Sequence, residues 1–236
     1  MFHFHEASQI RKGVVTKPFT LKSSIVTSFI LAAFLFPAAP LLAQHQAHVV
    51  VAQEPSQLKV AETDDVLRNL WVGHVFWVRN VVVETLAKNN AARDVAEKEV
   101  VANAKAIAAA IEPYYGKASS EKLFGLLAGH YSAVKHYLEA TAAGSKSKQN
   151  AAVKELNDNA GDIASFLSGA DPNLPFDTLR ELLIAHGARH IQQIQQIKIM
   201  QYEQEAQTWA AIKNHMYVIA DAPGEAIDKQ FTAKFS

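Results

Sequence analysis

Apolar residues recur at helical spacing along most of the chain, from about residue 62 onward. In the first such segment, Leu67, Leu70, Trp71 and Val78 fall on one stripe of a helix with 3.6 residues per turn. The segments are rich in Ala, Leu, Glu, Lys and Gln, which favour helices. No stretch alternates apolar and polar residues as a half-buried strand would. The pattern therefore predicts an all-α protein.

Clusters of Gly, Pro and Asn interrupt the apolar pattern and divide it into six segments of roughly 20–27 residues. The expected helices are 62–88, 91–112, 118–142, 147–168, 176–199 and 203–221. Ala222, Pro223 and Gly224 end the last helix in this interpretation, so that residues 224–236 form a C-terminal tail.

The six segments are related by an internal repeat of 56 residues. Equivalent positions carry the same residue type in triplets: Leu67, Leu123 and Leu179; His74, His130 and His186; Ile107, Ile163 and Ile219. Repeats of this kind are supersecondary units. The spacing predicts three tandem helical hairpins over residues 62–223, packed as an up-down antiparallel bundle of six helices.

The repeated histidines lie on the apolar stripes, where leucine would be expected. In antiparallel helices joined by short turns, residues equidistant from a turn lie at the same level. This rule predicts one inward-facing polar layer halfway along the bundle. Its six members are His74, Asn103, His130, Asn159, His186 and His215. His190 and Asp162 are each expected about one turn away from it.

Two interpretations of this layer remain open. In the first, His74, His130, His186, His215 and His190 bind a transition metal such as Zn, Cu, Ni or Fe, directly or within a metal cofactor. Asn103, Asn159 and Asp162 would then orient the imidazole rings. In the second, the layer is a structural hydrogen-bond network in a non-catalytic envelope protein whose partner is another protein. A buried polar group without a partner costs about 1–3 kcal/mol, so some partner is needed in either case.

Composition excludes several other classes of function. The chain contains no cysteine, which rules out disulfides, zinc–thiolate sites and iron–sulfur clusters. Lys and Arg together number 23, as do Asp and Glu, and this balance argues against nucleic-acid binding. The layer has no carboxylate for a ferritin-like di-iron centre. No His-Glu-x-x-His, Gly-x-Ser-x-Gly or phosphate-binding glycine motif occurs, so the sequence disfavours an enzyme.

The N-terminus has the order of regions found in a secretory signal peptide. Lys17 and Lys22 precede the apolar run 25–36, and small residues then lead to a cleavage position after Ala43. We therefore expect residues 1–43 to be removed, residues 44–61 to form a linker, and the protein to be periplasmic or secreted. The alternative is an uncleaved anchor, which would be the only contact with a membrane.

Residues 70–80 read LWVGHVFWVRN. This segment resembles a family of small, uncharacterised all-helical bacterial proteins whose first helix reads approximately Leu-Trp-x-x-His-Val-x-Trp-x-Arg. The matching residues here are Leu70, Trp71, His74, Val75, Trp77 and Arg79. Residues 159–175 are similar to a second segment of that family. The resemblance implies a helical fold and a role for His74, and it implies no reaction.

Overall fold

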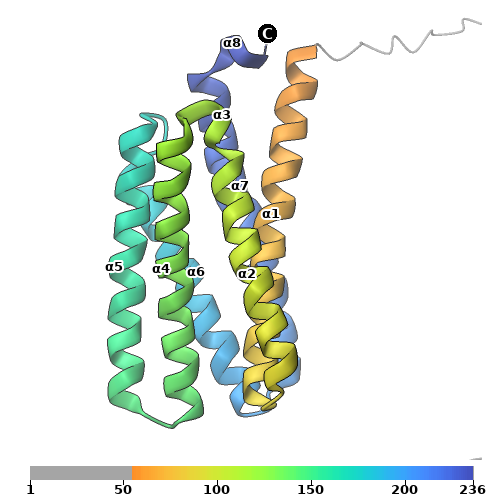
Figure 1. Ribbon diagram of the computed structural model, residues 1–236, viewed down its shortest axis with the longest axis vertical. Helices are drawn as coiled ribbons and strands as arrows, with labels where there is room; N and C mark the ends of the chain where they lie inside the picture. The colour runs from red at the N-terminus through yellow and green to blue at the C-terminus, as the bar shows by residue number, and fades with distance from the viewer. Residues whose placement is uncertain (1–54, 236) are drawn as a thin grey trace, which may run out of the picture. The chain divides into compact units, whose positions relative to one another are not determined.

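The computed structural model describes residues 55–235, and throughout these residues the protein is all-α with no strand. Six long helices and two single-turn helices make up this part of the chain (Figure 1). They are α1 (Pro55–Leu86), α2 (Asn90–Ala110), α3 (Glu112–Tyr115), α4 (Lys117–Ala142), α5 (Lys146–Ala170), α6 (Phe176–Lys198), α7 (Tyr202–Gln230) and α8 (Thr232–Phe235). The predicted signal peptide, residues 1–43, lies outside the described residues.

Two predicted helix ends were wrong. Helix α1 begins at Pro55, so the last residues of the expected linker 44–61 are helical. Proline is compatible with a helix start because its missing N–H would have no partner there. Helix α7 continues through Pro223 to Gln230, so most of the expected C-terminal tail is helical too.

Packing against α1 explains how α7 accommodates an internal proline. Pro223 removes one backbone hydrogen bond of the helix. The next residue, Gly224, lies so close to α1 that an added Cβ would collide with the Asp64 carboxylate and approach Leu67. The burial gained along this contact outweighs the local helix-breaking tendency of Ala222-Pro223-Gly224. The prediction of a helix end there rested on that local tendency alone.

The turns after α1, α4 and α6 share one backbone motif. Lys88, Gly144 and Met200 each adopt a left-handed conformation, with φ of 60°, 72° and 59°. In each turn the next residue donates its N–H to the carbonyl five positions earlier, at 2.9 Å in all three cases. This pattern is the Schellman ending of a helix, and it reverses the chain. The three motifs recur at the 56-residue spacing that the sequence shows.

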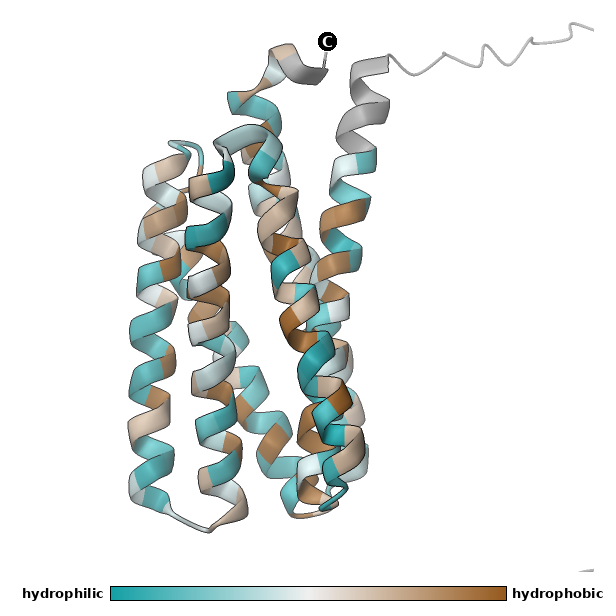
Figure 2. Ribbon diagram, viewed as in Figure 1, coloured by the Kyte–Doolittle hydropathy of each residue, from teal (hydrophilic) through white to brown (hydrophobic). Residues whose placement is uncertain are grey.

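The six long helices contact one another in a closed order. Each of α1, α2, α4, α5, α6 and α7 packs against the next, and α7 packs against α1. Helices α1, α4 and α6 also contact each other across the interior, so these three form the centre of the bundle. Hydrophobic and hydrophilic positions alternate along the helices (Figure 2). The histidines of the repeat lie on the three central helices, which places them in the core.

Candidate metal centre

Four buried histidines meet in the middle of the bundle. His74 comes from α1, His130 from α4, and His186 and His190 from α6. Their exposed fractions are 5%, 3%, 1% and 1%, so each ring is withdrawn from solvent. His186 and His190 share one face of α6 because residues four apart in a helix are neighbours. The predicted convergence of these side chains is therefore found in the structure.

His74, His186 and His190 have the geometry closest to a ligand set. One ring nitrogen from each lies within 4.8 Å of the others. The Nε2 atoms of His186 and His190 are 3.2 Å apart. Two nitrogens bound to one tetrahedral zinc at the usual bond length are about 3.3 Å apart. The α6 pair is thus already at chelating separation.

His130 extends this cluster from the facing helix. Its ring stacks on His186 with centroids 5.4 Å apart and planes inclined by 16°. Its Nδ1 is 3.1 Å from Oδ1 of Asn159, whose own amide nitrogen donates to the Leu126 carbonyl at 3.0 Å. Because that bond leaves Oδ1 as the acceptor, Nδ1 of His130 carries the proton. Nε2 of His130 therefore presents a lone pair, and this atom is buried without a protein partner.

One hydrogen bond recurs at equivalent places on α2, α5 and α7. Asn103 donates to the Leu70 carbonyl at 2.9 Å, and Asn159 donates in the same way to Leu126. His215 takes the asparagine's place and donates Nε2–H to the Leu182 carbonyl at 2.9 Å. The predicted ligand His215 is thus committed through Nε2, which leaves only Nδ1 for an ion. Its ring lies 6.4 Å from that of His186.

Two predicted supporting residues differ from Asn159. Asn103 uses its amide nitrogen but leaves Oδ1 buried without a partner. Asp162 is exposed on α5 and does not belong to the cluster. Asn159 is itself only partly buried, at the edge of the buried face of α5. Three residues further, the net helical offset of about 60° is enough to place Asp162 on the solvent side. Its expected role in orienting an imidazole was wrong.

Burial keeps the central histidines neutral. Loss of solvation lowers the pKa of His74 to about 3, with a further contribution from His130. The same cause lowers the pKa of His130 to about 4, against the opposing effect of the hydrogen bond that His130 donates to Asn159. Burial, reinforced by the neighbouring rings, lowers the pKa of His186 and of His190 well below the usual value. Neutral imidazole is the form that binds metals, so the cluster is in its ligand state at neutral pH.

Protein groups alone do not satisfy the cluster. When one of His186 and His190 donates Nε2–H to the other, the accepting ring must carry its proton on Nδ1. Neither Nδ1 atom has a protein partner among the described residues, so one buried N–H and one lone pair stay unpaired in either arrangement. An ion bound between the two Nε2 atoms would leave both Nδ1–H groups unpaired, but it would take up the lone pair on Nε2 of His130, which the protein leaves without a donor.

A second buried polar group beside the cluster was missed from the sequence. Gln193, three residues after His190 on α6, is fully buried and donates to Glu205 at 2.8 Å. Glu205 also accepts two hydrogen bonds from Arg79, at 2.7 and 2.8 Å. Glu205 lies in the first turn of α7, where acidic residues are common, so its pattern gave no sign of burial.

Comparison with known proteins adds no relative. Models of protein families, curated proteins and solved structures were each searched, and none matches this chain. The resemblance of residues 70–80 to a family of helical bacterial proteins therefore stays a prediction. Within residues 55–235, no helix combines the length and apolarity that crossing a bilayer requires.

Proposed function

We propose that this protein binds a transition-metal ion through His74, His186 and His190, with Nε2 of His130 as a fourth ligand. The observation that carries the proposal is the convergence of three buried imidazoles whose ring nitrogens lie within 4.8 Å of one another. Their burial and depressed pKa values keep them neutral at physiological pH. A set made only of imidazole nitrogens suits Zn, Cu, Ni and Fe and is unsuited to Mg or Ca.

Asn159 supports the proposed centre by fixing the tautomer of His130. Ligating histidines usually donate their second N–H to an oxygen that orients the ring. The hydrogen bond from His130 Nδ1 to Asn159 Oδ1 is of this kind. Asn103 is the equivalent residue on α2, and its buried Oδ1 is without a protein donor among the described residues.

We also propose that the bundle consists of three tandem hairpins, α1–α2, α4–α5 and α6–α7, in an up-down arrangement. Three features support it: the 56-residue spacing of equivalent residues, the Schellman turns at Lys88, Gly144 and Met200, and the recurring hydrogen bond across 33 residues. In this arrangement the metal lies where the first helices of the three hairpins meet.

The proposal places metal binding outside the cytoplasm. The support is the basic, apolar and small-residue order of residues 1–43, which is typical of a signal peptide. A site with buried nitrogen ligands and no carboxylate then serves to hold a metal in the periplasm or in the medium. It offers no group placed for acid–base chemistry at neutral pH.

The second candidate is a structural network in a protein that binds another protein. Two hydrogen bonds favour it: His186 with His190, and His130 with Asn159. The unpaired Nε2 of His130 argues against it, since a network retained for structure alone is expected to satisfy its own members.

Metal content distinguishes the two candidates. The protein is purified without an affinity tag, and its metals are measured by mass spectrometry in parallel with His130→Ala and His136→Ala. His136 is the matched control because it lies on the same helix but is exposed and paired with Glu155. We expect near-stoichiometric Zn, Cu, Ni or Fe in the parent and in His136→Ala, and a large loss in His130→Ala. No metal in the parent after incubation with all four ions would favour the structural network.

A further inference from the structure

An apolar cavity of about 40 Å³ lies in the core beside the histidine cluster. The three central helices line it with side chains located seven and three residues before their histidines. On α4 these are Leu123 and Leu127, before His130; on α6 they are Leu179 and Leu183, before His186. With a rise of 1.5 Å per residue, these positions are about 4.5 and 10 Å along the bundle from the histidines. The cavity is therefore the next layer of the core.

The lining gives the cavity its chemical character. All of its lining residues are Leu, Ile, Trp or Pro, so the indole N–H of Trp71 is the only polar side-chain group among them. A buried water needs two to four polar partners, and apolar cavities remain dry. This cavity therefore favours an uncharged guest that makes no hydrogen bonds.

The size of the cavity narrows the class of guest. It exceeds the ~10–15 Å³ that a single water requires and is about a quarter of the ~150 Å³ engineered cavity that binds benzene. Aromatic rings and lipid chains are too large. Diatomic molecules such as O₂, NO and CO are small, weakly polar and of suitable size.

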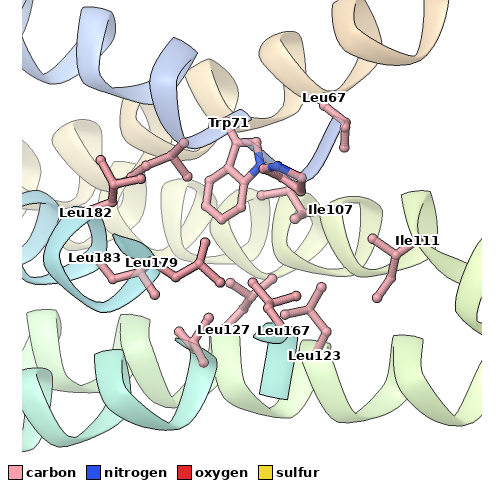
Figure 3. Close-up of a pocket in the computed structure, with 13 residues that line it drawn as sticks. Leu67, Trp71, Ile107, Ile111, Leu123, Leu127, Leu167, Leu179, Leu182 and Leu183 are labelled. Carbon is pink, nitrogen blue, oxygen red and sulfur yellow. The ribbon is translucent and has the colours of Figure 1, made fainter. Parts of the chain in front are cut away.

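Two contacts connect the cavity wall to the histidines. The Trp71 ring stands edge-on to His74, with centroids 6.1 Å apart and planes at 82°. In Figure 3 this ring lies between Leu182 and Ile107 at the cavity wall. The Leu182 carbonyl accepts the hydrogen bond from His215. The Trp71 side chain thus lines the cavity and also contacts the ring of His74.

We propose that this cavity is a binding site for a diatomic gas next to the metal, so that gas and metal occupy adjacent layers of the same core. The second half of this inference rests on the proposed metal function, whereas the cavity itself does not. A gas bound here is concentrated beside the ion in a dry environment. No covalent or redox step is implied.

Xenon tests the cavity in the metal-free protein. Its binding is followed by methyl chemical shifts in nuclear magnetic resonance. We expect saturable shifts at Leu123, Leu127 and Leu179, and at least a tenfold weaker affinity in Leu127→Phe, which fills the space. Leu86→Phe makes the same change on α1 near the Lys88 turn and should leave xenon binding unchanged. Leu179→Phe serves as a second filling variant, and the melting temperature of each variant confirms that it is folded.

Carbon monoxide tests the connection to the metal. Protein loaded with Cu(I) is exposed to CO, which would take the coordination position of the fourth ligand, His130. The C–O stretch is recorded for the parent, Leu127→Phe and Leu86→Phe. We expect the same C–O band in the parent and in Leu86→Phe. In Leu127→Phe we expect this band to be shifted or lost. Absence of saturable xenon binding in the parent, or xenon binding as tight as the parent's in both Leu127→Phe and Leu179→Phe, would overturn the gas site. Identical CO bands in all three proteins would overturn its connection to the metal. Xenon binding in a protein that takes up no copper would instead contradict the proposed metal function and would still support the gas site.

Discussion

Nε2 of His186 lies 3.2 Å from Nε2 of His190, one helical turn apart in the core of the bundle. Two neutral imidazoles at this distance share one proton in a hydrogen bond or share one metal ion. The hydrogen bond satisfies one atom on each ring and leaves both Nδ1 atoms without a protein partner. The proposed metal would account for the gathering of His74 and His130 around the same point.

Removing the side chain that orients His130 should weaken metal binding without removing a ligand. In Asn159→Ala, His130 loses the acceptor that fixes its proton on Nδ1. We expect the metal affinity to fall about 10–100-fold, the range found for such supporting residues. Competition with a chromophoric chelator measures the affinity. Asn157→Ala, at an exposed position of the same helix, is the control and should bind as the parent does. Equal affinities for the two variants would contradict the role assigned to Asn159.

Replacing His74 with leucine should abolish tight metal binding while leaving the metal-free protein at least as stable. Leucine matches the apolar stripe of α1, and replacing a buried polar group with an apolar one of similar shape is often neutral or stabilising. We expect the free energy of unfolding of apo His74→Leu to equal or exceed that of the parent by about 1 kcal/mol. Urea denaturation measures it. A loss of about 2 kcal/mol or more would show that His74 serves the fold instead.

Acid should destabilise the metal-free protein from near pH 6.5 downward. The pKa values of His74 and His130 are about 3 and 4 in the folded protein and 6.5 when exposed. Below pH 6.5 the histidines of the unfolded chain bind protons, whereas the buried histidines of the folded protein remain neutral. The free energy of unfolding is therefore at its full value above pH 6.5 and falls as the pH decreases toward the folded pKa values. Each histidine contributes about 2 kcal/mol of destabilisation by pH 5. Unfolding free energies at pH 7.5 and 5 measure the effect.

Saturating zinc should reduce this loss of stability because bound imidazoles cannot be protonated. Equal stability of the apo protein at both pH values would contradict this account.

The turns offer a test of the repeat that is independent of the metal. Gly144 occupies the left-handed position in the second turn, whereas Lys88 and Met200 occupy it in the other two. In this conformation a residue with a Cβ destabilises the folded protein by roughly 1 kcal/mol relative to glycine. We expect Met200→Gly and Lys88→Gly each to stabilise the protein by about that amount, and Gly144→Ala to destabilise it. Thermal unfolding measures all three, and destabilisation by either glycine variant would argue against equivalent turns.

The sequence predicted the helical class and the meeting of the histidines because both follow from periodicity. A buried stripe at helical spacing and a fixed repeat length determine which residues share a face, and His74, His130 and His186 were placed correctly on that basis. The end of α7 was missed because its continuation through Pro223 depends on contact with Asp64 and Leu67, which are far away in the chain.

Details of the candidate site depend on side-chain direction, which periodicity does not supply. Spacing alone could not show that His215 would hydrogen-bond to Leu182, or that Asp162 would face solvent. The burial of Gln193 and Glu205 was missed for a related reason, because long polar side chains on a helix usually reach solvent.

X-ray absorption spectroscopy of the zinc-loaded protein tests the central claim most directly, since it reports the atoms bound to the ion. The account predicts three or four nitrogen ligands at about 2.0–2.1 Å with the multiple scattering of imidazole, and loss of that signal in His190→Ala. A shell of oxygen ligands without imidazole scattering, or a spectrum that is the same in His190→Ala, would contradict the histidine cluster as the metal centre.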